Sequence, residues 1–226
     1  LSLTPTPYCR CATWSGGAVD PVSGTRWGGV TSNGVTLSLS HDEGGVDGVW
    51  ASLGSHWLRG KNVVDNQRLS AMTGYYYRLV DRADERMRTG LTLMYWGYDK
   101  DLSEYTLGQG GYYSPQRYYS IGIPFSYAWR NANWSAQLDS SVGWSVSKTD
   151  GSDLYPLDGP AGKLFSQAAA AGLEIDPDTT LTKDGSSSSG ASIRLQGLVE
   201  RRLTNHMVVG SGITLQHSEG YAPSRA

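Results

Sequence analysis

The sequence predicts an all-β protein, an antiparallel transmembrane β-barrel of the outer-membrane type, on the basis of three observations. Side chains alternate between apolar and small or polar in many segments, most clearly in residues 118–129. The chain contains 8 Trp and 14 Tyr but only 2 Phe, and Trp and Tyr are the aromatic residues that gather at membrane interfaces. The expected connections between strands alternate between short and long, as they do in barrels of outer membranes.

The composition excludes several other classes of protein. With 226 residues and a formal net charge of -2, the chain is long enough for a core and lacks the basic excess of a nucleic-acid binder. No run of roughly 18 apolar residues occurs, which excludes a helical membrane span. The first residues lack the basic and apolar parts of a signal peptide, so we expect a mature form or a fragment. Cys9 and Cys11 are too close for an unstrained disulfide and too few for a zinc site, so no metal or cofactor is expected.

The segment from Tyr105 to Tyr127 joins a loop rich in glycine and tyrosine to the clearest strand. One face of that strand would carry large apolar side chains, namely Tyr119, Ile121, Ile123, Phe125, Tyr127 and Trp129. The other face would carry Tyr118, Ser120, Gly122, Pro124, Ser126 and Ala128. An apolar face that ends in aromatic residues suits a lipid boundary better than the aliphatic core of a soluble sandwich.

Eight strands are predicted in chain order, because apolar side chains occupy alternate positions in each. They cover residues 34–40, 46–57, 67–79, 87–98, 118–129, 134–146, 193–203 and 207–216. The apolar series of the first four begin with Val35 and Leu37, Val49 and Ala51, Leu69 and Ala71, and Leu91 and Leu93. Those of the last three begin with Trp134 and Ala136, Ile193 and Leu195, and Met207 and Val209.

The connections between these strands are predicted to alternate in length. Short turns are expected at 41–45, 81–85, 131–133 and 204–205, and longer connections at 60–66, 99–116 and from Val146 to Ser189. Within the last connection, residues 167–175 could form a short helix and the serine-rich residues 186–190 are expected to be flexible. Tight turns on one side and long loops on the other are typical of an outer-membrane barrel, whereas Greek-key sandwiches need no such order.

The predicted inward faces indicate a wide bore. Small eight-stranded barrels fill their interior with side chains, whereas the inward set here is dominated by Ser, Gly, Thr, Gln and Arg. Such a set would pack a closed eight-stranded interior poorly. We therefore expect the chain to supply about half of a larger barrel.

Four blocks of sequence carry a resemblance to a known family. They are Asp20–Val30, Gly60–Arg68, Tyr98–Ser120 and Ser140–Trp144, and Tyr221–Ser224 fits a position near the end of that family. On these blocks the chain resembles the C-terminal β-barrel domain of the outer-membrane exporter of bacterial cellulose synthase systems. Residues 1–11 depart from the family pattern.

The resemblance implies that residues 1–226 are one outer-membrane domain, the C-terminal part of a longer protein. The family's barrel has sixteen strands and follows a periplasmic array of tetratricopeptide repeats, and neither the earlier strands nor a helical repeat is present here. The implied function is a porin-like channel, not an enzyme, that exports cellulose, a β-1,4-glucan, for the biofilm matrix. The implied partners are the glucan, outer-membrane lipid, and an inner-membrane cellulose synthase complex reached through the periplasmic repeats.

A neutral glucan needs a conduit of hydrogen-bonding groups and aromatic platforms without tight binding sites. The polar candidates for the wall are Ser135, Gln137, Asp139, Ser141, Arg194, Gln196 and Glu200. The aromatic candidates are Tyr76, Trp96, Tyr112, Tyr113 and Tyr118, which could equally serve as an interfacial girdle or as loop packing. A flexible gating loop is expected at Gly108, Gly110, Gly111, Ser114, Pro115 and Gln116, since no helix follows that would make a phosphate loop.

Three alternatives remain open. An outer-membrane protease or lipase could pair His56 or His217 with a carboxylate of the external rim, although no serine nucleophile motif accompanies them. The rim carboxylates are those of Asp65, Asp99, Asp101 and Glu104. A soluble sugar-binding β-sandwich would use the same aromatic residues and would need no detergent for extraction. An anionic, alginate-like polymer is less favoured, because acidic residues balance the inward arginines Arg68, Arg78, Arg194 and Arg202.

Overall fold

The computed structural model describes residues 2–6, 11–12, 17–20, 24–157, 182–204 and 206–218, and in these residues the protein is all β. Eight long strands form its body: β4 (Arg26–His41), β5 (Asp47–Lys61), β6 (Val63–Asp81), β7 (Glu85–Tyr98), β8 (Arg117–Arg130), β9 (Trp134–Thr149), β12 (Ser186–Thr204) and β13 (Met207–Ser218). The short strands are β1 (Ser2–Thr6), β2 (Cys11–Ala12), β3 (Ala18–Val19), β10 (Ser152–Asp153) and β11 (Thr182–Lys183). Among the described residues, no helix is long and apolar enough to cross a membrane.

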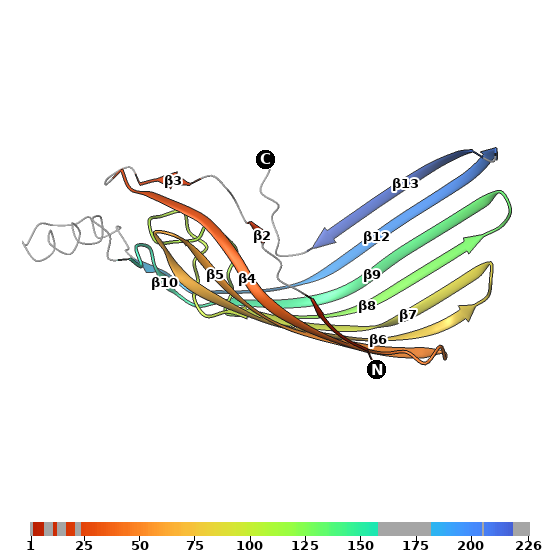
Figure 1. Ribbon diagram of the computed structural model, residues 1–226, viewed down its shortest axis with the longest axis horizontal. Helices are drawn as coiled ribbons and strands as arrows, with labels where there is room; N and C mark the ends of the chain where they lie inside the picture. Colours follow the sequence, from red (N-terminus) through yellow and green to blue (C-terminus); the bar gives the residue numbers. More distant parts are fainter. Residues whose placement is uncertain are drawn as a thin grey trace, which may run out of the picture.

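The long strands lie side by side in chain order and bend together into one curved sheet (Figure 1). Each pairs antiparallel with its neighbours in the sequence, from β4 to β13, while β1, β2 and β3 pair with β4. β10 and β11 form a separate two-stranded sheet. In the described part of the chain the large sheet does not close on itself, because β13 pairs only with β12. The antiparallel all-β prediction is therefore confirmed, and closure into a barrel is not observed.

The sheet has one apolar and one polar face, as the alternation predicts. On the apolar face, register places Leu93 opposite Ile121, and Ile121 opposite Trp144, so that large side chains adjoin from strand to strand. These side chains are exposed, with Ile121 at 46% and Trp144 at 49%. On the polar face the corresponding row runs through Met72, Met94, Ser120 and Ser145, and these side chains are half-buried. The polar face is therefore the more enclosed of the two.

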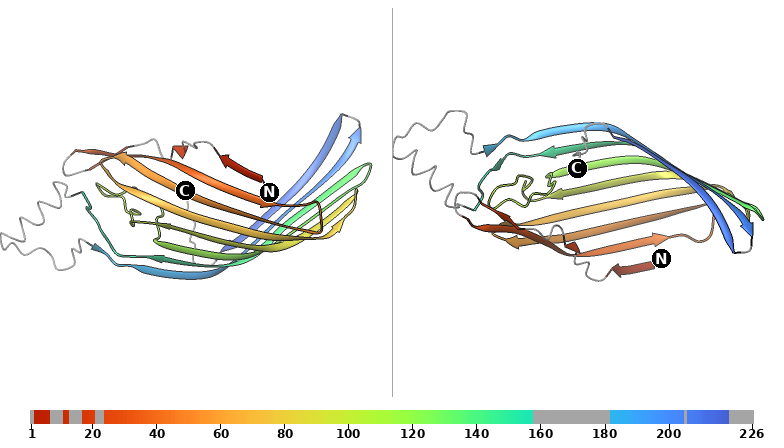
Figure 2. Two further views of the ribbon diagram at one scale, coloured as in Figure 1. Left: turned by 60° about the horizontal axis from the view of Figure 1, so that its bottom comes forward. Right: turned by 90° about the horizontal axis from the view of Figure 1, so that it is seen from above.

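The two ends of the sheet differ in their connections. The hairpin turns after β4, β6, β8 and β12 gather at one end, here called the turn end, on the right of Figure 1. Side chains close these turns: the carboxylate of Asp42 accepts from the amide of Gly44 at 2.8 Å, and Asn131 Oδ1 accepts from the amides of Asn133 and Trp134. The connection of residues 99–116 and the hairpin of β10 and β11 lie at the opposite end, here called the loop end (Figure 2). All four predicted turns are confirmed as short connections between paired strands, and Asn205 of the last one lies outside the described residues.

The prediction of a long connection at 60–66 is wrong. β5 continues to Lys61 and β6 begins at Val63, so that only Asn62 separates them and Gly60 pairs with Val63. Asn62 has a φ of 52°, a left-handed conformation that asparagine tolerates, and its side-chain amide donates to the carbonyl of Arg26 at 2.8 Å. A residue that accepts positive φ makes a tight turn possible where polar composition suggests a loop.

The serine-rich segment 186–190 is not a flexible linker but the first part of β12. Ser186, Ser187 and Ser188 pair with Thr149, Lys148 and Ser147 of β9. Backbone pairing with a neighbouring strand overrides the weak preference of serine for irregular structure. The expected helix at 167–175 and Cys9 lie outside the described residues, and for Cys11 only its place in β2 is described.

A small apolar core lies at the loop end and not between two layers of sheet. It consists of Trp27, Val30, Leu58, Val63, Leu102 and Leu107, each at most 7% exposed. The first four belong to the ends of β4, β5 and β6, and the last two belong to the connection 99–116. The connection therefore packs against the strand ends and adds the apolar contacts that the open sheet lacks.

Candidate functional site

The seven predicted polar wall residues all lie on the polar face, on the adjacent strands β9 and β12. Register places Ser141 opposite Arg194, Asp139 opposite Gln196, and Ser135 opposite Glu200. Hydrogen bonds join six of the seven in pairs: Ser135 Oγ donates to Glu200 Oε2 at 3.0 Å, Gln137 Nε2 to Asp139 Oδ2 at 3.0 Å, and Arg194 Nη2 to Gln196 Oε1 at 3.3 Å. The structure brings this predicted group together as a polar strip, in which Leu198 is the apolar residue opposite Gln137.

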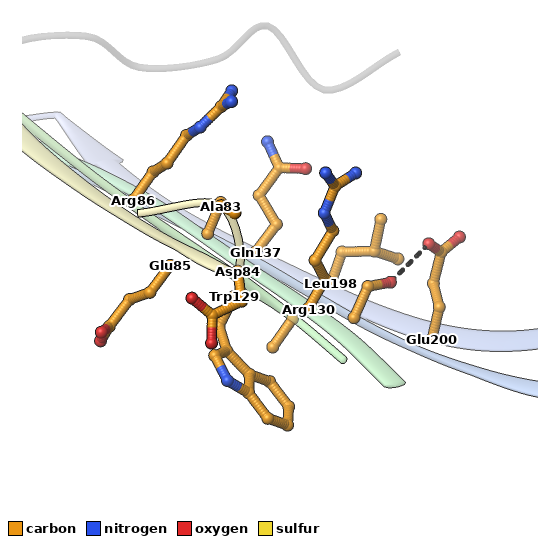
Figure 3. Close-up of a pocket in the computed structure, with 12 residues that line it drawn as sticks. Ala83, Asp84, Glu85, Arg86, Trp129, Arg130, Gln137, Leu198 and Glu200 are labelled. Atoms are coloured by element: carbon orange, nitrogen blue, oxygen red, sulfur yellow. Dashed lines mark hydrogen bonds between the residues drawn. The ribbon is translucent and has the colours of Figure 1, made fainter. Parts of the chain in front are cut away.

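The turn end shows the separation of the two faces directly. In Figure 3, Gln137, Arg130 and Glu200 lie on one side of the sheet, whereas Trp129 and Glu85 lie on the other. At this end the side with Gln137 carries mostly hydrogen-bonding groups together with Leu198, whereas the other side carries the indole of Trp129 and the carboxylate of Glu85. The strip continues on this side to the last residues before the turns.

Four of the five predicted aromatic residues form one cluster at the loop end, together with Tyr98. Trp96 is central, with ring centroids 4.9 Å from Tyr118, 5.7 Å from Tyr113 and 5.8 Å from Tyr98, and Tyr98 lies 5.5 Å from Tyr112. Burial raises the pKa of the Tyr112 phenol to about 12, so Tyr112 is part of the packing. Tyr113 is 56% exposed and offers an accessible ring.

Tyr76 lies apart from this cluster, near the turn end. Its hydroxyl donates to the carboxylate of Asp42 in the turn after β4, and the guanidinium of Arg78 lies 5.4 Å from the centre of its ring. The hydrogen bond from Tyr76, the amide of Gly44 and the nearby Arg78 together hold the pKa of Asp42 below its ordinary value of 3.8. Asp42 therefore stays ionised and fixes the orientation of Tyr76.

The predicted gating loop is the most buried part of the described chain. Gln109 and Ser114 are fully buried and Leu102 is 2% exposed, although the glycine content suggests a flexible loop. The amides of Gly110 and Gly111 both donate to the carbonyl of Leu102, at 3.0 and 2.9 Å. Gly108 has a φ of 98° and lies against Pro156 and Leu157, where a Cβ would be in tight contact. The glycines thus permit close packing in a compact loop. Pro115 and Gln116 lead from it back to the sheet, and the carbonyl of Pro115 accepts from the amide of Tyr98 at 2.9 Å.

Asn66 on β6 fastens this loop to the sheet. Its Nδ2 donates to the carbonyl of Lys100 at 2.9 Å and to the hydroxyl of Tyr112 at 3.1 Å. Its Oδ1 accepts from the amides of Gln67 and Lys100, at 3.0 and 3.1 Å. Sequence reasoning missed Asn66 because it placed this residue in a polar loop.

Lys183 on β11 joins the same loop to the β10–β11 hairpin. Its Nζ lies 3.3 Å from Asp101 Oδ2 and 2.9 Å from Glu104 Oε1, and donates to Ser103 Oγ at 2.7 Å. Burial lowers the pKa of Lys183, but the hydrogen bond to Glu104 and the attraction of Asp101 outweigh it, so the pKa lies above 10.5. No signal in the sequence pointed to Lys183, which lies inside a connection without a periodic pattern.

Three of the four rim carboxylates contact cations other than histidine. Asp65 lies 3.3 Å from the guanidinium of Arg59, and Asp101 and Glu104 contact Lys183. His56 lies opposite Gly34 and Arg68 on the polar face, and its Nδ1 has no hydrogen-bond partner in the described part of the chain. His217 lies opposite Ile193 on the apolar face. Within the described residues, these three carboxylates thus form their ion pairs with Arg59 and Lys183 and with neither histidine.

Comparisons with known proteins agree with the resemblance. The family described as "Cellulose synthase operon protein C C-terminus" matches residues 12–226. A relative named cellulose synthase operon protein C from Escherichia coli K12 is 46% identical over 211 residues, 92% of this chain and 18% of its own length. The proteins of the same name from Salmonella typhimurium and Xanthomonas axonopodis pv. citri are 44% and 35% identical to this chain, over 92% and 91% of its length. The chain spans 18%, 17% and 14% of the length of these three relatives.

Proposed function

Because the chain belongs to the family of cellulose synthase operon protein C C-termini, we propose that it forms part of an outer-membrane β-barrel that exports cellulose. The observation that carries the proposal is the two-faced sheet, in which an exposed apolar surface spans the long strands while the opposite face is polar. A soluble protein rarely exposes an apolar patch of more than a few hundred Å². Hydrocarbon chains of lipid are the natural cover for such a surface.

The distribution of aromatic residues supports a membrane boundary. On the apolar faces of β8 and β9, Tyr127, Trp129 and Trp134 lie towards the turn end, and Tyr119 and Trp144 lie towards the loop end. The residues between them are mostly aliphatic, namely Ile121, Ile123, Ala136, Leu138 and Val142, together with Phe125 and Ser140. The guanidinium of Arg201 lies 5.2 Å from the centre of the Trp134 ring. Aromatic rings and arginine side chains that reach past them are typical of the two membrane interfaces.

The polar face is the proposed wall of the conduit, and the barrel is completed by strands of the longer protein. Serine, glutamine and paired charged groups can exchange hydrogen bonds with glucan hydroxyls as the polymer passes, and none forms a deep pocket that would hold it. The chain acts as a passage and not as a catalyst. An inner-membrane synthase, connected through the periplasmic part of the protein, supplies the polymer.

The packed loop 99–116 is the proposed gate at the cell-surface mouth. It lies on the loop end, opposite the short turns, and outer-membrane barrels carry their longer loops outside. Asn66 and Lys183 fix the loop to the sheet and to the β10–β11 hairpin. Opening requires that these contacts break together, which makes the gate a two-state element.

Single-channel conductance of the full-length protein in a planar bilayer tests the proposal. We expect insertion, a measurable conductance, transient block by cello-oligosaccharides, and a higher conductance in a variant that lacks residues 108–116. A protein that is extracted without detergent and never inserts would contradict the proposal and favour a soluble sugar-binding sandwich. Insertion without any response to cello-oligosaccharides would retain the barrel and exclude cellulose as its cargo.

A further inference from the structure

Two aromatic side chains on the polar face each lie over a glycine of the neighbouring strand. Trp50 on β5 is opposite Gly74 on β6, and Tyr76 on β6 is opposite Gly48 on β5. A Cβ at Gly74 would overlap the indole of Trp50, and a Cβ at Gly48 would overlap the phenol of Tyr76. Both glycines are buried, whereas both aromatic residues are only half-buried. The rings therefore rest against the sheet and leave part of their surface open to the polar side.

The open sides of these rings face a hollow that extends across the sheet to the polar strip. Trp50 and Tyr76 line one side of it, and Asp139, Ser141, Arg194 and Gln196 line the other. Between them lie β7 and β8, which contribute the smaller residues Thr92 and Pro124. The hollow thus combines an aromatic surface with hydrogen-bonding groups on the opposite side.

Tyr76 is held in place before any ligand arrives. Its hydroxyl is bound to Asp42, and Arg78 binds the same carboxylate at 2.5 Å. Arg88, which also lines the hollow, donates from Nε to Ser126 Oγ at 2.7 Å. A ring whose orientation is fixed in this way loses little conformational entropy on binding.

We propose that Trp50 and Tyr76 form a stacking subsite for the pyranose rings of a β-linked glucan, with its hydroxyl edge directed to Asp139, Arg194 and Gln196. The subsite rests on the proposed export function and specifies where on the wall the polymer is guided. A β-1,4-linked chain is flat, with apolar C–H faces and equatorial hydroxyls at its edges. That shape matches an aromatic surface beside a polar strip. The sequence pattern indicates Tyr76 but not Trp50.

The experiment measures how long cellohexaose blocks single channels of the full-length protein in planar bilayers. We expect the block to shorten about tenfold in Trp50→Ala and in Tyr76→Ala, on the order of one aromatic contact. Gly74→Val should have a similar effect without removing an aromatic residue, because its side chain would displace the indole from the sheet. Trp50→Phe keeps a ring and should lie between wild type and Trp50→Ala.

Two controls use the apolar face. Trp144→Ala removes an exposed aromatic side chain there, and Gly197→Ala adds a methyl group whose nearest neighbour is 3.6 Å away. Cellohexaose should block the channels of both variants for the same time as those of the wild type. Maltohexaose, whose α-linkages make a curved chain, should block briefly and equally in wild type and Trp50→Ala. Variants are compared only after resistance to SDS at low temperature shows that they are folded.

The outcomes separate this inference from the proposed function. If the wild type conducts and cellohexaose blocks all variants for the same time, the proposed stacking subsite is wrong, whereas the proposed export channel is retained. If the wild type never conducts, both proposals fail. A longer block by an anionic oligogalacturonate than by cellohexaose would assign the hollow, with Arg88 and Arg194, to an acidic polymer and overturn the inference.

Discussion

Asn66 shows how a single amide can hold a loop against a sheet. It is 5% exposed, and its side chain makes four hydrogen bonds, two of them to the backbone of Lys100. A buried amide without these partners would be unfavourable, and so would the loop groups without the amide. The residue therefore links strand β6 to the loop in a way that no apolar side chain could replace.

Replacement of Asn66 by alanine should lower the free energy of unfolding by about 1–3 kcal/mol, because the amide and carbonyl of Lys100 lose their partner in a partly buried site. Denaturant unfolding of the full-length protein in detergent measures this loss. Asn133→Ala is the matched control, since Asn133 is exposed in the turn before β9. Equal losses in the two variants would contradict the role given to Asn66.

Among the structural elements, the loop 99–116 and the β10–β11 hairpin are joined through Lys183. Lys183→Ala removes its contacts to Asp101, Glu104 and Ser103 and should weaken the docked loop by about 1 kcal/mol, a modest value because the lysine side chain is 31% exposed. Hydrogen exchange of the amides of Gly110 and Gly111 should become faster to the same degree. Lys148→Ala, which breaks an exposed pair with Asp150 at 3.7 Å, should leave this exchange unchanged.

The pH dependence of the Lys183 contact follows from its raised pKa. The stabilisation is fully present below the unfolded-state value of 10.5 and is lost as the pH rises through the higher folded-state value. The difference in loop exchange between wild type and Lys183→Ala should therefore persist to pH 10.5 and disappear above the folded-state pKa. A difference that already vanishes near neutral pH would contradict the ion pairs.

The strands were predictable because successive side chains of a strand point to opposite faces of the sheet, so that apolar and polar residues alternate, as β8 and β9 show. The turn at Asn62 was not, because the strands continue through polar residues and a single left-handed asparagine reverses the chain. The polar wall residues could be found for the same reason as the strands, since register alone places them on one face. The packing of Gln109 and the contacts of Lys183 depend on segments distant in sequence, for which composition carries no signal.

The whole molecule is asymmetric across the sheet, and this asymmetry is what the membrane proposal uses. Its only compact apolar core lies, within the described residues, at the loop end, while most large apolar side chains along the strands are exposed. In water this arrangement would expose a broad apolar surface. In a bilayer lipid would match the same surface, and in the proposed barrel closure with further strands would shield the polar face.

The final prediction compares the two faces at adjacent positions of β8. Ile121, 46% exposed on the apolar face, and Ser120, half-buried on the polar face, differ by one residue and therefore lie at nearly the same depth. Ile121→Arg should destabilise the protein folded in vesicles by about 2–4 kcal/mol, since an arginine within the apolar band of the barrel contacts hydrocarbon. Ser120→Arg should cost much less, because its side chain would enter a watery conduit. Equal costs would mean that the two faces meet the same solvent, and the assignment of the apolar face to lipid would then be wrong.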